Sequence, residues 1–429
     1  MWLVVSGVFA LIASIQLHTP GFLSDCPILT HGRVRVLQET AFVYGWLGTA
    51  GPALAVWILG RLSGSPLRGT SWLGVGAAFW NAGLALGLVG IAIGDGTGTA
   101  LFGLPAYVHP VMLASYAAIA IAGVLAWTGR RRGPMFAAQW YAAAALFLFP
   151  WLFSAADIML VLAPVRGVLQ AVVAGWFAQG LWTLWMAPLA LAGAYYVVPR
   201  LTGKTLPNYD AASLGFWCLV FVGGWTGGRH LIGGPVPAWI STLAVVTTAM
   251  LVFHYVVVAL NLRPALGAGS VLRFIAFGVG SYVLGGFVDA VTAARSVAVS
   301  TQFTTFDQAQ QQLALYGGVS MLLYGTLYFA IPRIAGRAWS SADLLRGHFA
   351  LAATGIALLV VSLGAAGLSQ GRDLADPSVS FAAMATHMQV WLLVATGAQA
   401  ILLLGNLLLA VNFLETAVLK PGSGEGVAS

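Results

Sequence analysis

Long apolar runs separated by short polar connections follow one another along the whole chain. Each run is close to, or longer than, the about 20 residues that an α-helix needs to cross the hydrocarbon core of a bilayer. The pattern therefore predicts an all-α integral membrane protein with twelve spans and no soluble domain between them. The spans are predicted at roughly 2–18, 38–60, 72–94, 105–127, 136–162, 168–197, 211–228, 237–260, 271–294, 311–332, 348–368 and 385–413.

The composition agrees with a membrane bundle. Of the 429 residues, 59% are hydrophobic and only 7% are charged, so a soluble fold would leave much apolar surface in water. We predict a single membrane domain over residues 1–429 that ends in a short flexible cytoplasmic tail over 414–429. The first apolar run lacks a basic start and a small-residue cleavage site, and we predict a retained helix rather than a signal peptide.

Lysine and arginine are distributed unevenly between the two sets of loops. The loops after even-numbered spans, together with the tail, carry 13 of the 19 basic residues, against six after odd-numbered spans. The positive-inside rule then predicts that both termini are cytoplasmic, and we place the chain in a bacterial inner membrane. The net charge of +7 reflects this orientation, so no nucleic-acid partner is predicted.

Two ten-residue segments resemble copies of one another. Residues 195–204 read YYVVPRLTGK and residues 328–337 read YFAIPRIAGR, and each ends a long apolar run at a basic loop. Both segments therefore mark the inner end of a span and set the register of the predicted bundle.

Further segments carry a resemblance to a known family. Residues 31–38 read HGRVRVLQ, residues 138–141 read AQWY, residues 225–231 read WTGGRHL and residues 409–413 read LAVNF. In this order, and with the two copied segments, they resemble subunit I of the C-family (cbb-type) heme–copper oxidases, which are related to bacterial nitric oxide reductases. The resemblance covers roughly residues 30–415. It implies a twelve-helix bundle of the heme–copper oxidase subunit I type.

The resemblance also implies where redox centres would be bound. Such an enzyme uses six histidines, of which two clamp a low-spin heme, one holds a high-spin heme and three hold copper. The positions that match heme ligands are Gln38, Gln310 and Gln312, and those that match copper ligands are Gln179, Arg229 and His230.

Only His230 keeps an imidazole at these positions. The chain contains no H-x-H or H-H pair, and no histidine lies between His254 and His348, so a shift of one residue does not restore the ligands. A glutamine amide is a poor donor to iron, and Arg229 brings positive charge to the place of a copper cation. We therefore predict no cofactor, with heme b and copper present only if the chain is an active enzyme.

Removal of two hemes leaves space that a stable bundle has to fill. Large aromatic residues near these positions are predicted either to fill it or to belong to interfacial belts and ordinary core. Glutamines that face each other are predicted to satisfy one another's amides. The aromatic residues are Trp176, Phe177, Trp182, Trp185, Trp225 and Phe306.

Ionisable residues within spans are costly and mark candidate functional positions. We predict that Arg229 pairs with Asp289 or Asp157; the alternative is that these residues and Arg295 reach the outer interface individually. Tyr282 matches the family's redox tyrosine and, without copper, is predicted to be a core tyrosine.

Five histidines are expected near the outer face. They are interpreted as interfacial residues rather than a copper site, because none is spaced as a pair of ligands. These residues are His18, His31, His109, His230 and His387.

The leading functional hypothesis is a cofactor-free, non-catalytic scaffold or partner subunit in a respiratory electron-transfer assembly, beside a c-type cytochrome or another redox subunit. The first alternative is a catalytic oxidase or nitric oxide reductase subunit that reduces oxygen or nitric oxide and couples the reaction to proton movement. The second is a small-molecule or metal permease, for which the glycine-rich stretch 223–234 is the candidate pathway.

Overall fold

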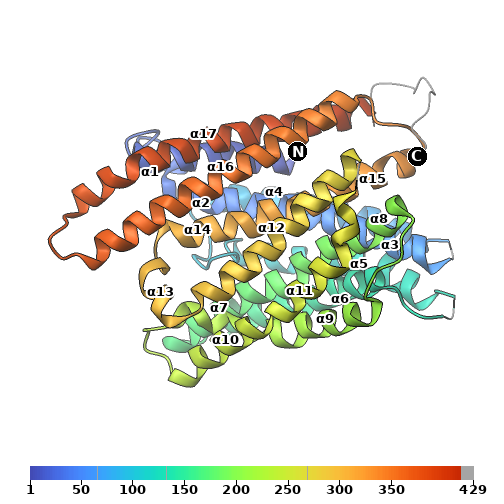
Figure 1. The fold of residues 1–429 in the computed structure, drawn as a ribbon, viewed down its shortest axis with the longest axis horizontal. Helices are drawn as coiled ribbons and strands as arrows, with labels where there is room; N and C mark the ends of the chain where they lie inside the picture. Colours follow the sequence, from blue (N-terminus) through green and yellow to red (C-terminus); the bar gives the residue numbers. More distant parts are fainter. Residues whose placement is uncertain (65, 132, 268, 417–429) are drawn as a thin grey trace. The chain divides into compact units, whose positions relative to one another are not determined.

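The computed structural model describes residues 1–64, 66–131, 133–267 and 269–416 (Figure 1). These residues form helices and connecting loops, with no strand among them, which confirms the all-α prediction. The chain divides into two compact units. The terminal unit comprises Met1–Gln38 and Ala265–Ser429, and the central unit comprises Glu39–Pro264. A single membrane domain stays a prediction, and most of the predicted tail lies outside the described residues.

Ten of the twelve predicted spans are helices long and apolar enough to cross a membrane, in the part of the chain that the structure describes. They contain 23 to 35 residues each. The other two predicted spans are the apolar but shorter helices α1 (Trp2–His18) and α9 (Tyr209–Gly223). The count of twelve crossings and the orientation of the chain stay predictions.

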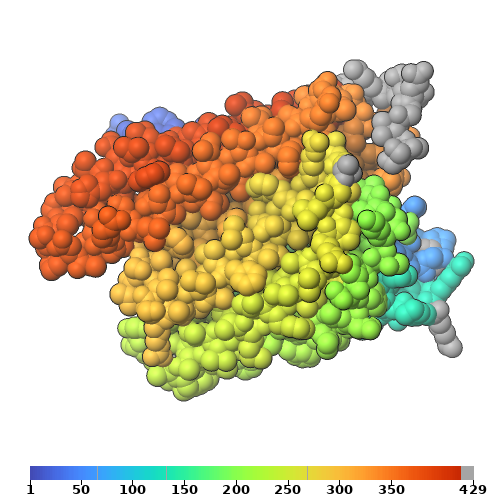
Figure 2. Space-filling view, in the orientation of Figure 1, coloured from blue at the N-terminus to red at the C-terminus, as the bar shows by residue number. Residues whose placement is uncertain are grey.

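The terminal unit is built around two 34-residue helices, α16 (Ala342–Ala375) and α17 (Phe381–Leu414). They pack against each other along their length, and α1 packs on α17 (Figure 1). Figure 2 shows the side chains of α16 and α17 as an orange and red surface. Apolar side chains such as Val361 and Val390 are exposed on these helices, which suits contact with lipid. The remaining elements are η1 (Pro27–Leu29), α2 (His31–Thr40), α12 (Ser270–Thr292), α13 (Arg295–Thr301), α14 (Thr305–Gln312), η8 (Leu313–Ser320) and α15 (Met321–Ala335).

The central unit holds the helices drawn from blue to yellow-green in Figure 1. Its interior is rich in aromatic rings, among them Trp80, Phe149 and Trp185. Its elements, besides α9, are η2 (Ala41–Leu47), α3 (Gly48–Ser63), α4 (Thr70–Ile93), η3 (Ala106–Val108), α5 (His109–Thr128), α6 (Ala137–Asp157), η4 (Ile158–Leu162), α7 (Val168–Gly180), η5 (Leu181–Met186), α8 (Ala187–Thr202), η6 (Thr226–Leu231), α10 (Ala238–Met250) and α11 (Val252–Leu262). The turn η7 (Arg263–Leu266) joins the two units in sequence.

One irregular helix arrangement occurs three times in the described residues. An α-helix passes into a π-helical segment and then continues as a second α-helix, in α2–η2–α3, α7–η5–α8 and α14–η8–α15. Each second helix ends at a glycine in the left-handed conformation, with φ of +66° at Gly64, +65° at Gly203 and +63° at Gly336. A glycine is favoured there because a Cβ atom would clash with the backbone at positive φ.

The two copied segments have the same local structure. The amide of Gly203 donates to the carbonyl of Pro199, and the amide of Gly336 donates to that of Pro332. In both segments the arginine guanidinium lies over the aromatic ring four residues earlier, 5.1 Å from the ring centre for Arg200 and 3.6 Å for Arg333. The similarity seen in the sequence is therefore a repeated way of ending a helix.

Candidate functional site

The glutamines at the former ligand positions lie where α-helix changes to π-helix. Gln38 lies three residues before η2, Gln179 two residues before η5, and Gln312 directly before η8. Segments of π-helix are rare and occur often at functional sites, because the extra residue per turn redirects side chains. In three separate predicted spans, a π-helical segment thus follows a position that matches a ligand of the family.

The positions that match heme ligands belong to the terminal unit. The Nε2 of Gln310 donates a 2.9 Å hydrogen bond to the hydroxyl of Thr292, at the end of α12. The Oε1 of Gln312 is buried and makes no hydrogen bond to any residue that the structure describes. The side chain of Gln38 is half-buried, and its backbone carbonyl accepts a 3.0 Å bond from the hydroxyl of Ser6.

We expected the side-chain amides of the glutamines to satisfy one another. This expectation is wrong for Gln310, because its amide donates to Thr292, at the place where α14 packs beside the end of α12. Asp289 lies half-buried on α12, less than one turn before Thr292, and Tyr282 is buried on the same helix with 1% exposure. A core position for Tyr282 agrees with its predicted role.

The positions that match copper ligands belong to the central unit, on α7 and η6. These elements touch backbone to backbone: a Cβ atom at Gly175 would lie 2.8 Å from the carbonyl oxygen of Gly227, and one at Gly227 would lie 2.5 Å from that of Gly175. Only glycine fits at such a crossing. Gln179 follows Gly175 by one helical turn, and Arg229 and His230 follow Gly227, so the structure brings together the segments that carry all three positions.

The donor set at the six positions does not fit heme or copper. Four positions are glutamines and one is an arginine, whereas these metals require imidazole lone pairs in this setting. An amide nitrogen has no free lone pair, and that of Gln310 already donates to Thr292. Among the described residues, no three His, Cys, Asp or Glu side chains come together as a possible metal site.

Aromatic residues near these positions have different surroundings. Phe177 and Trp185 are fully buried, and the indole of Trp185 donates a 2.9 Å bond to the hydroxyl of Tyr116 and lies 4.3 Å from Phe149 between ring centres. Trp225 is 60% exposed, so it does not fill the interior, and of the two alternatives its exposure agrees with the interfacial one. Trp176, Trp182 and Phe306 are half-buried.

A histidine–carboxyl pair joins two helices of the central unit. The Nδ1 of His109, at the start of α5, lies 2.6 Å from Oδ1 of Asp157, at the end of α6. Its Nε2 lies 2.9 Å from the carbonyl oxygen of Leu104. Because a carbonyl only accepts, Nε2 carries the hydrogen of its contact with Leu104. Both ring nitrogens of His109 are therefore engaged, one by Asp157 and one by the loop that carries Leu104.

The surroundings of His109 correct its interpretation as an interfacial residue. Its side chain is 1% exposed, and its ring lies 4.5 Å from that of Phe102 and 5.3 Å from that of Phe153. Phe102 also contacts Phe177, at 4.7 Å between ring centres. The loop before α5 thus inserts Phe102 into the unit and is held by His109. Sequence reasoning missed this contact because its partners are 48 residues apart.

The partner of Asp157 in the structure is thus the imidazole of His109. Pairing of Arg229 with Asp289 or Asp157 stays a prediction. Of the other histidines expected near the outer face, His387 lies 2.9 Å from Asp373, and His18 contacts the hydroxyls of Thr19 and Thr396.

Known proteins share this sequence pattern and fold. The family model described as Cytochrome C and Quinol oxidase polypeptide I matches residues 1–401. The chain is 23% identical to cytochrome c oxidase subunit 1 of Rhodobacter capsulatus, with 98% of this chain and 84% of the relative covered. It is 21% identical to the cbb3-type cytochrome c oxidase subunit CcoN1 of Stutzerimonas stutzeri, with 86% and 81% covered.

A solved structure supports the same fold. A cryo-EM structure of a heme–copper terminal oxidase dimer aligns with a TM-score of 0.70 at 12% identity, covering 99% of this chain and 85% of that one. At this identity the match concerns the fold, and it agrees with the bundle type expected from the motifs.

Proposed function

We propose that this chain, which belongs to the family of cytochrome c and quinol oxidase polypeptide I, is a cofactor-free and non-catalytic member of it. Its role would be that of a membrane scaffold or partner subunit in a respiratory electron-transfer assembly. The observation that carries the proposal is the replacement of five of six ligand positions by glutamine or arginine within a retained backbone frame.

The retained frame favours a structural role over simple decay of an enzyme. The described residues contain three helix–π–helix segments with glycine ends, and the fold aligns with that of a heme–copper terminal oxidase. Arg229 at a copper position would repel a cation in a medium of low dielectric constant. A polypeptide that keeps the shape of subunit I can still present that shape to other subunits.

The proposed partners follow from the relatives. Several of them are named as subunits of cytochrome c oxidases, which implies assembly with further chains in those proteins. For this chain we propose a c-type cytochrome or another redox subunit as neighbour. The proposed location is a bacterial inner membrane with both termini in the cytoplasm, supported by ten apolar helices and by the distribution of basic residues.

A heme and metal assay tests the proposal. The full chain is extracted from membranes with its co-purifying subunits, and heme is measured by pyridine hemochrome and copper by mass spectrometry. We expect far less than one heme and one copper per chain, with a respiratory subunit among the co-purifying proteins. A heme–copper terminal oxidase taken through the same preparation controls for cofactor loss.

The names of the relatives favour the catalytic alternative, and the same assay decides between the two. Addition of hemin to the purified chain provides a second test, since a site that had lost its heme would give a saturable Soret shift at one equivalent. Stoichiometric heme in either experiment, held by this polypeptide, would establish a terminal reductase instead of a scaffold.

A further inference from the structure

A buried polar cluster lies in the terminal unit, where side chains of α15, α16 and α17 meet. His348 on α16 is 0% exposed and Asn406 on α17 is 2% exposed. The Nδ1 of His348 lies 3.0 Å from the hydroxyl of Tyr328, and the hydroxyl of Tyr324 donates a 3.2 Å hydrogen bond to Oδ1 of Asn406. None of these residues is among the positions that match heme or copper ligands.

His348 and Asn406 each have one further buried polar atom. The Nε2 of His348 and the Nδ2 of Asn406 make no hydrogen bond to any residue that the structure describes. A buried donor or acceptor without a partner is costly, and in folded proteins nearly all such groups are bonded to protein or to ordered water. A small polar molecule bound at these two atoms would remove that cost.

Tyr324 and two glycines connect the surroundings of the two atoms. The ring centre of Tyr324 lies 4.6 Å from that of His348, and its hydroxyl holds Asn406. A Cβ atom added at Gly405 would lie 3.6 Å from Cδ2 of His348, the ring carbon that is bonded to Nε2. A Cβ atom added at Gly7, on α1, would lie 3.6 Å from Nδ2 of Asn406. Each atom thus lies beside a helix that carries no side chain at that point, which leaves room for a small molecule.

The two atoms select a molecule that both donates and accepts hydrogen bonds. The amide nitrogen of Asn406 only donates. The Nε2 of His348 accepts when Nδ1 donates to Tyr328, and it donates when Nδ1 accepts from Tyr328. Water satisfies the amide together with either form of the imidazole. An ion does not serve both forms, and its charge would be costly in surroundings that include the ring of Phe274, 5.2 Å from that of His348.

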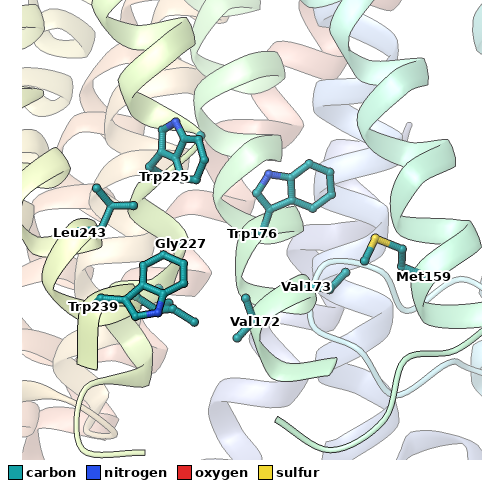
Figure 3. Close-up of a pocket in the computed structure, with 11 residues that line it drawn as sticks. Met159, Val172, Val173, Trp176, Trp225, Gly227, Trp239 and Leu243 are labelled. Carbon is teal, nitrogen blue, oxygen red and sulfur yellow. The ribbon is translucent and has the colours of Figure 1, made fainter. Parts of the chain in front are cut away.

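The apolar pocket of the central unit provides a contrast. This pocket of about 290 Å³, between α7, η6 and α10, is lined mainly by apolar side chains such as Trp176, Leu243 and Met159 (Figure 3). Among the described residues, none of the buried side-chain nitrogen or oxygen atoms that lack a partner belongs to its lining. Apolar cavities of this kind stay free of ordered water. Binding of water therefore requires unpartnered polar atoms as well as space, and the polar cluster of the terminal unit has both.

We propose that α16 and α17 bind one internal water molecule between Nε2 of His348 and Nδ2 of Asn406. The water links the two 34-residue helices of the terminal unit, which Tyr324 and Tyr328 already join to α15. The site goes beyond the proposed function and is independent of it, because it holds whether or not the chain carries heme.

X-ray radiolytic footprinting of the full chain in nanodiscs tests the site. An X-ray pulse converts water to hydroxyl radicals, which oxidise the side chains next to the water from which they form. We expect mass spectrometry to find oxidation of His348, of Tyr324 or of both, several-fold above the level of Tyr116. Tyr116 is the matched control, because it is 0% exposed and its hydroxyl is engaged by the carbonyl of Ala145 and the indole of Trp185. Oxidation of both cluster residues at or below the level of Tyr116 would overturn the proposal.

Two variants locate the water. Asn406→Leu removes the amide, and His348→Phe removes the imidazole but keeps a ring. In both variants we expect oxidation of the remaining cluster residues to fall to the level of Tyr116. The matched control is Gln399→Leu, which removes another buried amide from the same face of α17 and should leave the oxidation of Tyr324 and His348 unchanged. A variant that unfolds is identified by strong oxidation of Tyr116, and the other variant then decides. Oxidation that persists in the folded variants would place the water elsewhere and overturn the proposal.

Discussion

Replacement of Asp157 by alanine is expected to lower the free energy of unfolding by about 3 kcal/mol. Removing one partner of a buried pair leaves the other with an uncompensated polar group, at a cost of about 3–5 kcal/mol. The lower value applies here because the side chain of Asp157 is 15% exposed and water can partly replace it, whereas His109 is 1% exposed. Unfolding of the detergent-solubilised chain by increasing SDS, followed by circular dichroism, measures the loss.

A double-mutant cycle separates pairing from local packing. His109→Gln and Asp157→Asn are measured alone and together, and we expect the double variant to lose less than the sum of the single variants, because each single change already breaks the pair. The pair between His387 and Asp373 is the matched control. His387 is 52% exposed, so His387→Gln should cost about 1 kcal/mol or less. Additive losses at His109 and Asp157 would show that their contact contributes nothing.

The fold could be predicted from the sequence because long apolar runs determine most of it. Runs near residues 72–94 and 271–294 became α4 and α12 with ends within a few residues of those expected. The copied segments also identified two helix ends, since Pro-Arg followed by glycine gives the same left-handed stop at Gly203 and Gly336. The π-helical segments could not be predicted. They have the same apolar composition as the α-helix around them, and their extra residue per turn follows from packing.

The candidate site was predictable in part. The family resemblance implied that Gln179, Arg229 and His230 share one place, and the crossing of Gly175 with Gly227 brings their segments together. The partners of individual side chains depend on rotamers and on residues far away in the sequence. Thr292 as partner of Gln310, and Asp157 as partner of His109, therefore became visible only in three dimensions. Which single aromatic residues are buried could not be predicted from the sequence either, as the 60% exposure of Trp225 illustrates.

A second large loss of stability is expected from an added side chain where α16 crosses α13 and α14. A Cβ atom at Gly371 would overlap the carbonyl oxygen of Ser300, and one at Gly367 would overlap the amide nitrogen of Phe306. Both obstacles are backbone atoms, which cannot move without moving their helix. The start of α14 is fixed to the same face of α16, since the amide of Thr305 donates a 2.8 Å bond to Oε1 of Gln370.

Gly371→Ala is therefore expected to destabilise the chain by about 3 kcal/mol, the upper end of the range for overpacked sites. Displacement of the backbone away from the added Cβ atom would also move α14, which carries Gln310 and Gln312. Gly397→Ala on α17 is the matched control, because its added Cβ meets nothing within 4 Å. Alanine favours a helix over glycine by up to about 1 kcal/mol, so this control should stabilise the chain. In the same SDS titration, a loss of stability in Gly371→Ala together with a gain in Gly397→Ala would establish that close backbone contact, and not helix propensity, decides the result at Gly371. A change in the same direction in both variants would contradict this explanation.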